Sequence, residues 1–163
     1  MSTTQQAAEA RIEADPSVPA IHITRDFSAT PAQLMRAHTD PELFARWVGP
    51  ADIGTTIDTW DARDGGSWRF RNHRGDWETA FRGCFHTVRP DRLVQTFTWE
   101  EMPDSVALET MTLTDLGDGR TRLHATSLMG SFEERDGMLS SGMDVGVNDG
   151  YAALDRMLAE GEL

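Results

Sequence analysis

The chain is poor in cysteine and in basic residues, and it has no long apolar run. Cys84 is the only cysteine, so an intrachain disulfide and a CxxC metal pair are excluded. Fifteen basic against 27 acidic residues give a net charge of -12. This balance argues against nucleic acid or a membrane surface as a partner, because both favour a basic face. Without an apolar run of about 18 residues or a signal-peptide core in residues 1–14, we expect a cytoplasmic protein with no membrane segment.

Catalytic and metal-binding motifs are also scarce. No histidine pair has HExxH or His-x-His spacing, and there is neither a GxSxG elbow nor a glycine-rich phosphate loop. We therefore expect no metal and no cofactor, and Cys84 is expected to be a small core residue. The lone histidines are weak candidates for acid–base chemistry, led by His73 and His86 because their strands are predicted neighbours; the others are His22, His38 and His124.

The length of 163 residues and a hydrophobic content of 39% are typical of one globular domain. Residues 1–19 are polar and end in Asp-Pro-Ser-Val-Pro, which predicts a flexible N-terminal tail. Residues 20–163 are predicted to form the single domain. Its fold class is α+β, because helical and strand patterns occupy separate parts of the sequence.

Alternation in residues 21–27 predicts a first strand, and two short helices should follow it. Thr30-Pro31 and Asp40-Pro41 each place a capping side chain before a proline at the first helical position. From Ile53 to Met129, turn residues separate six strands that should pair in an antiparallel meander. The alternation within these strands predicts a sheet with one buried and one solvated face.

A capping box at Ser131 to Glu134 predicts the start of one long last helix. Its apolar stripe is spaced by three and four residues: Leu139, Met143, Val147, Tyr151, Leu154 and Leu158. Such a helix should lie on the concave side of the sheet. Gly142, Gly146 and Gly150 each cost about 1 kcal/mol relative to alanine within a helix. They indicate either close approach of the helix to the sheet or room for a ligand beside it.

Three segments, read in order, resemble one known family. They are TDPELFARWVGP at residues 39–50, GGSWRF at residues 65–70 and MLSSGMDVGVNDG at residues 138–150. Together they resemble the START-like (SRPBCC) superfamily, in the branch named after the activator of the heat-shock protein 90 ATPase. The resemblance covers about residues 21–158. It implies a helix-grip fold, in which a curved antiparallel sheet in β-α-α-β6-α order wraps around a long C-terminal helix and encloses a cavity.

The cavity implied by the resemblance would take a hydrophobic or aromatic ligand, lipid-like or polyketide-like. Apolar residues of the sheet and the last helix are its expected lining, with Asn72 inside or at the rim because it shares a strand face with Trp68 and Phe70. Other candidate orienting groups are Arg69, Gln95, Glu109 and Asn148. The predicted ligand-binding residues are Trp47, Phe70, Asn72, Phe85, Phe97, Trp99, Met111, Met138, Met143 and Val147.

Two valines depart from the family pattern. The family commonly has Trp-Trp-Gly-Pro where this chain has Trp47-Val48-Gly49-Pro50, and Gly-Trp where this chain has Gly146-Val147. If these side chains point inward, the exchange of an indole for an isopropyl group enlarges the cavity. If Val48 points outward, its exchange matters little.

Three functions are compatible with these observations. The first is a small-molecule binding protein, and the second is a cyclase or dehydratase that moves protons with His73 or Glu109. The third is a chaperone-associated ATPase activator, ranked last because only a short tail precedes the predicted domain. A homodimer is possible, since an open sheet leaves edges to protect.

Overall fold

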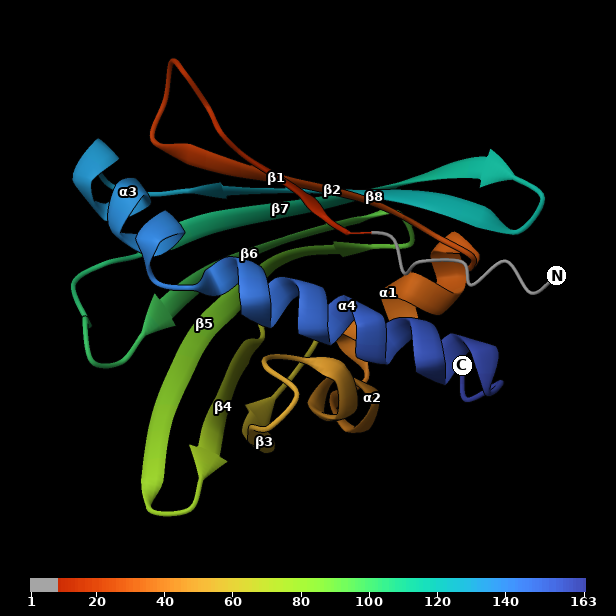
Figure 1. The fold of residues 1–163 in the computed structure, drawn as a ribbon, viewed down its shortest axis with the longest axis horizontal. Coiled ribbons are helices and arrows are strands. Elements are labelled where there is room, and N and C mark those ends of the chain that lie inside the picture. The colour runs from red at the N-terminus through yellow and green to blue at the C-terminus, as the bar shows by residue number, and fades with distance from the viewer. Residues whose placement is uncertain (1–8) are drawn as a thin grey trace, which may run out of the picture.

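The computed structural model describes residues 9–163, which form an antiparallel sheet with helices on one side (Figure 1). The strand order is β1-β2-β8-β7-β6-β5-β4-β3. From one edge of the sheet to the other, the strands are β1 Arg11–Ala14, β2 Ala20–Phe27, β8 Arg120–Leu128, β7 Ala107–Gly117, β6 Arg92–Trp99, β5 Trp77–Arg89, β4 Ser67–Arg74 and β3 Gly54–Trp60. The predicted six-strand meander is therefore confirmed as β3 to β8.

The four helices of the described residues are α1 Pro31–Thr39, α2 Pro41–Trp47, α3 Phe132–Ser140 and α4 Met143–Ala159. The first two begin as the sequence predicts. The hydroxyl of Thr30 accepts a hydrogen bond from the Gln33 amide, and the Gln33 side chain accepts one from the Thr30 amide. The carboxylate of Asp40 caps α2, directly after α1 ends.

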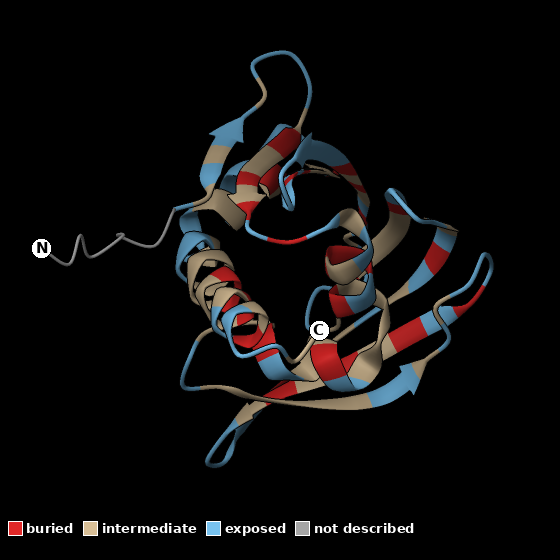
Figure 2. Ribbon diagram, turned by 90° about the vertical axis from the view of Figure 1, so that its right-hand side faces the viewer, coloured by how far each residue is buried: buried red, intermediate tan, exposed pale blue. Residues whose placement is uncertain are grey.

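The sheet curls around the helices, so its concave face forms the core (Figure 2). α4 crosses this face, and α2 packs beside it. Strand alternation places Trp68 and Phe70 inside, while Arg69 and Arg71 lie on the outer face and pair there with Asp58. The outer arginines thus belong to a solvated ion-pair network, so Arg69, a candidate orienting group, points away from the core.

Two parts of the chain differ from the sequence-based predictions. Residues 11–14, expected in a flexible tail, form β1 and pair with β2; residues 1–8 of that tail lie outside the described residues. The predicted single last helix is two helices, because Gly142 adopts a φ of 85° between α3 and α4. Cys84, expected in the core, is exposed because it faces away from buried Phe85 on β5.

A buried ion pair fixes α4 to the sheet. The guanidinium of Arg25 on β2 donates two hydrogen bonds to the carboxylate of Asp155 on α4, at 2.9 and 2.6 Å. Its Cζ lies 4.5 Å from the ring centroid of Phe27 and 5.7 Å from that of Tyr151. Because the Arg25 side chain is only 2% exposed, this contact is part of the core.

The sheet does not close, so β1 and β3 are its edges. The homodimer suggested by such edges stays a prediction. Within residues 9–163, no helix is long and apolar enough to span a lipid bilayer.

Candidate functional site

A cavity of about 270 Å³ lies between the concave face of the sheet and α4. Side chains of β2, β3, β4, β6, β7 and β8 line it from the sheet side, and α1, α2 and α4 contribute from the helix side. Its volume is near the lower end of the range for small-molecule sites, roughly 300–1,000 Å³. The space therefore suits a compact ligand.

Most of the cavity wall is aromatic. Neighbouring ring centroids lie 5.0 to 6.0 Å apart, for example 5.4 Å between Phe44 and Phe70 and 6.0 Å between Trp47 and Tyr151. These separations are typical of packed aromatic pairs. The aromatic wall, as we call it, consists of Phe44, Trp47, Trp60, Trp68, Phe70, Phe97 and Tyr151.

The indole N–H groups of this wall are not all satisfied by the protein. Trp47 Nε1 donates to the Ala37 carbonyl and Trp60 Nε1 donates to the Thr39 carbonyl, at 2.9 and 2.7 Å. Trp68 Nε1 is buried and has no hydrogen-bond partner in the described part of the chain. A buried donor without an acceptor is costly, so Trp68 carries an unsatisfied polar atom in the core beside the cavity.

A ladder of three polar side chains interrupts the apolar lining on the sheet side. Gln95, Glu109 and Ser127 face one another across β6, β7 and β8 because the strand register makes them direct partners. Gln95 Nε2 donates to Glu109 Oε1 at 3.0 Å, and Ser127 Oγ donates to Glu109 Oε2 at 3.2 Å. Both neighbours thus hold the Glu109 carboxyl group in place.

Burial shifts the pKa of every ionisable group that lines the cavity. Burial raises the pKa of Glu109, and the hydrogen bonds from Gln95 and Ser127 offset part of this increase. Burial lowers the pKa of His38 to about 4 despite the bond from its Nδ1 to the Leu34 carbonyl. Burial also raises the pKa of Tyr151. At neutral pH His38 and Tyr151 are therefore uncharged, while the pKa of Glu109 lies above its ordinary value.

Glu109→Gln is expected to stabilise the folded protein at neutral pH and above. Because the pKa of Glu109 is raised in the folded state above its ordinary 4.5, stability falls as pH rises from that value toward the folded-state pKa. The amide of the variant does not ionise and escapes this loss. Urea unfolding should show equal stabilities near pH 4 and a more stable variant at pH 8; a difference independent of pH would contradict this.

The structure brings five of the predicted ligand-binding residues to this cavity. They come from α2, three strands and α4: Trp47, Phe70, Phe97, Met111 and Val147. Val48 also lines it, so both valines that replace a family indole border the open space.

The other five predicted residues lie elsewhere. Asn72 is buried but accepts a hydrogen bond from Thr55 Oγ1 at 3.0 Å. Phe85 is 1% exposed and packs on Trp60 outside the cavity. Trp99, the last residue of β6, is 37% exposed and donates its indole N–H to a threonine hydroxyl.

The two remaining methionines, Met138 and Met143, pack against a separate small cluster that contains Ile21, Ala107 and Met129. The break at Gly142 explains this position. It separates α3 from α4, and α3 contacts β2 at the end of the sheet.

Of the polar candidates, Gln95 and Glu109 reach the cavity. His73 bonds to Thr56 Oγ1 on the opposite face of the sheet from Phe70, at 3.0 Å. Asn148 accepts a hydrogen bond from the Ala10 amide instead, and His86 is exposed on β5. Within residues 9–163, no three acidic, cysteine or histidine side chains form a group suited to a metal ion.

The sequence analysis missed several lining residues, chiefly His38, Trp60, Ser127 and Tyr151. Tyr151 lies on the predicted apolar stripe of the last helix, and this was a usable signal. Ser127 could be found only from the register that pairs it with Glu109. Whether a residue of α1 or α2 lines the cavity depends on how these helices pack against the sheet. The local sequence pattern does not show this packing.

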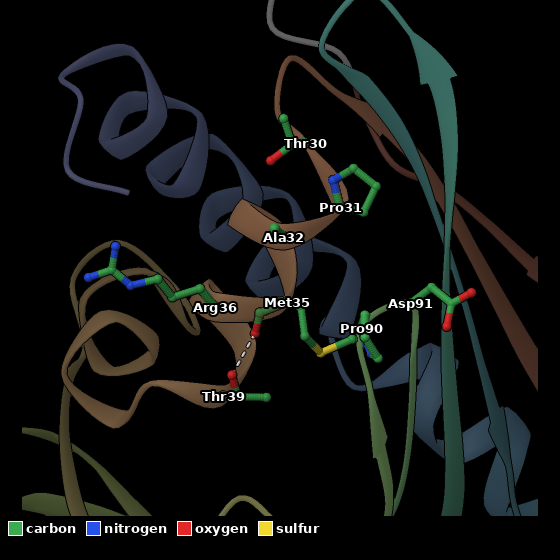
Figure 3. A pocket seen from close by; sticks show the side chains of 8 residues that line it. All are labelled: Thr30, Pro31, Ala32, Met35, Arg36, Thr39, Pro90 and Asp91. Atoms are coloured by element: carbon green, nitrogen blue, oxygen red, sulfur yellow. Dashed lines mark hydrogen bonds between the residues drawn. The ribbon is translucent and has the colours of Figure 1, made fainter.

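A second hollow, of about 840 Å³, lies between α1 and the turn from β5 to β6 (Figure 3). It is larger in volume, but much of that space opens to solvent. Its polar groups include the Thr39 hydroxyl, which already donates to the Met35 carbonyl at 2.8 Å. We therefore take the smaller and less open cavity as the candidate site.

Comparison with solved structures supports the helix-grip fold. An Arthrobacter aurescens protein is 25% identical with a TM-score of 0.83, covering 92% of this chain and 91% of its own. A Rhodobacter sphaeroides protein is 26% identical with a TM-score of 0.81, covering 93% and 99%. DynU16, from the dynemicin biosynthetic locus, is 23% identical with a TM-score of 0.65, covering 88% of this chain and 48% of its own.

The sequence itself shows the family. No match was found among curated proteins. The model of one protein family, however, matches residues 28–159, which include both short helices, β3 to β8 and α4. The α+β helix-grip prediction is thereby confirmed, and the chain belongs to the family of Activator of Hsp90 ATPase homolog 1-like proteins.

Proposed function

We propose that this protein binds a compact hydrophobic or aromatic small molecule in the cavity between the sheet and α4. The observation that carries the proposal is the cavity itself, about 270 Å³ with a mainly aromatic wall and one polar ladder. Small-molecule sites commonly combine such apolar walls with a few fixed polar groups that orient the ligand.

Val147→Trp is expected to abolish ligand retention, because an indole at this position on α4 occupies the cavity. Val145→Trp is the matched control, since Val145 is 56% exposed on the same helix. The measurement is native mass spectrometry of gently purified protein, followed by denaturing extraction of whatever is bound. A small molecule on the unaltered protein and on the control, but not on Val147→Trp, supports the proposal. Equal retention by all three proteins would place the molecule elsewhere, and no adduct on any of them would count against stable binding.

Glu109 favours a second candidate function, a cyclase-like or dehydratase-like reaction in the same cavity. Burial raises the pKa of the Glu109 carboxyl group, so it holds a proton more readily than a surface carboxylate, as a general acid–base group does. The occurrence of the structural neighbour DynU16 in a biosynthetic locus fits this class. Conversion of the extracted compound by the unaltered protein, lost in Glu109→Gln, would support this function; return of the compound unchanged would leave binding alone.

A further inference from the structure

The cavity combines an aromatic wall with a single acidic side chain, and the basic side chain of His38 in its lining is uncharged at neutral pH. None of its lining residues is arginine, and the sequence contains no lysine. The guanidinium of Arg25 lies near the Tyr151 ring, but Asp155 binds it through two hydrogen bonds. Within residues 9–163, the carboxyl group of Glu109 receives hydrogen bonds only from the neutral side chains of Gln95 and Ser127. Nothing in the lining therefore supplies a positive charge to match it.

Aromatic rings attract positive charge as well. The face of an indole, phenol or phenyl ring carries the negative part of its quadrupole, and cations bind within about 6 Å of the ring centre. Seven rings line this space together with the Glu109 carboxyl group. An organic cation in the cavity would satisfy Glu109 and contact several rings at once, whereas an anion would meet an unfavourable potential from both.

The net charge of the whole chain also favours a cationic ligand. A net charge of -12 lowers the potential around the protein and raises the local concentration of cations. The same charge disfavours fatty acids, phosphates and other anions as cavity ligands. Size limits the cation further, because about 270 Å³ holds one aromatic ring with a small charged substituent.

From these features we infer that the cavity ligand is a compact organic cation, an amine or quaternary ammonium compound carrying an apolar or aromatic group. The inference rests on the proposed binding function and narrows its ligand class. Glu109 pairs with the positive charge, and the aromatic wall encloses the rest of the molecule.

Two molecules of nearly identical shape test this inference. Phenyltrimethylammonium and tert-butylbenzene differ in the central atom and its charge, and neither can donate a hydrogen bond. In calorimetric titrations at low salt, the cation is expected to bind about tenfold more tightly than the neutral compound, a typical cation–π advantage. Glu109→Gln should weaken cation binding by about tenfold and leave the neutral compound unaffected.

Glu133→Gln is the control for total charge. It removes one negative charge from an exposed position on α3, outside the cavity, and should leave both affinities nearly unchanged. Equal affinity for the two compounds would overturn the cation inference and keep the binding proposal. An equal loss in Glu109→Gln and Glu133→Gln would overturn it too, since the effect would then be general electrostatics. If neither compound binds, the inference fails, and the extraction experiment with Val147→Trp still decides the proposed function separately.

Discussion

Replacing Asp155 with alanine is expected to destabilise the protein by about 2–3 kcal/mol. Breaking a buried ion pair typically costs about 3–5 kcal/mol because the remaining charge stays in the interior. Here the remaining charge is that of Arg25, whose side chain is 2% exposed. The expected loss is below that range because the Asp155 side chain is 36% exposed and Arg25 has a further interaction.

An ion pair on the surface provides the comparison for Asp155→Ala. Arg122 on β8 donates two hydrogen bonds to Asp26 on β2, in the same bidentate arrangement. The two side chains are 51% and 27% exposed, so Arg122→Ala should cost less than about 1 kcal/mol. Urea unfolding of both variants measures the contrast, and similar losses in the two would show that burial of Arg25 is not the cause.

Gly150→Ala is expected to destabilise the protein by about 1–2 kcal/mol, although alanine is the better helix former. A methyl group at this position of α4 would lie 2.9 Å from the backbone carbonyl oxygen of Trp47. That atom belongs to the end of α2 and cannot turn aside as a flexible side chain can. The helix would have to move away from α2, and the cavity bordered by both helices would change shape.

Gly146→Ala should have the opposite effect, a gain of about 0.5–1 kcal/mol from helix propensity. One turn earlier on α4, the added methyl group would meet only Pro50 Cδ at an ordinary 3.6 Å. Thermal unfolding of the two variants side by side tests the pair. A gain at both positions would mean that α4 and α2 are not held in close contact.

These glycines show how far the sequence could predict this structure. Their spacing correctly singled out a special stretch of helix, and close approach is the explanation at Gly150. The close contact, however, is with α2 and not with the sheet. At Gly142 the stripe of apolar residues continues from Leu139 to Met143 across the break, so periodicity could not distinguish one helix from two.

The sheet was more predictable than the cavity because its signals are local. Turn residues separate the six meander strands, and alternation assigns each side chain to a face. The strand β1 has no such pattern; it forms because β2 offers an unpaired edge. The cavity depends on how large side chains from distant elements fit together, and on the register that aligns Gln95, Glu109 and Ser127. Neither can be predicted from spacing alone.

The pairing of β2 with β8 has a consequence for how the molecule acquires its structure. Every strand from β3 to β8 pairs with its neighbour in sequence, whereas β2 joins the sheet only through β8, with Ala20 opposite Leu128. Closing so large a loop is entropically costly and slow compared with forming local hairpins. During synthesis the first strands therefore emerge long before their partner. The ion pair between Arg25 and Asp155 also requires α4, so we expect the two ends of the fold to join late in folding.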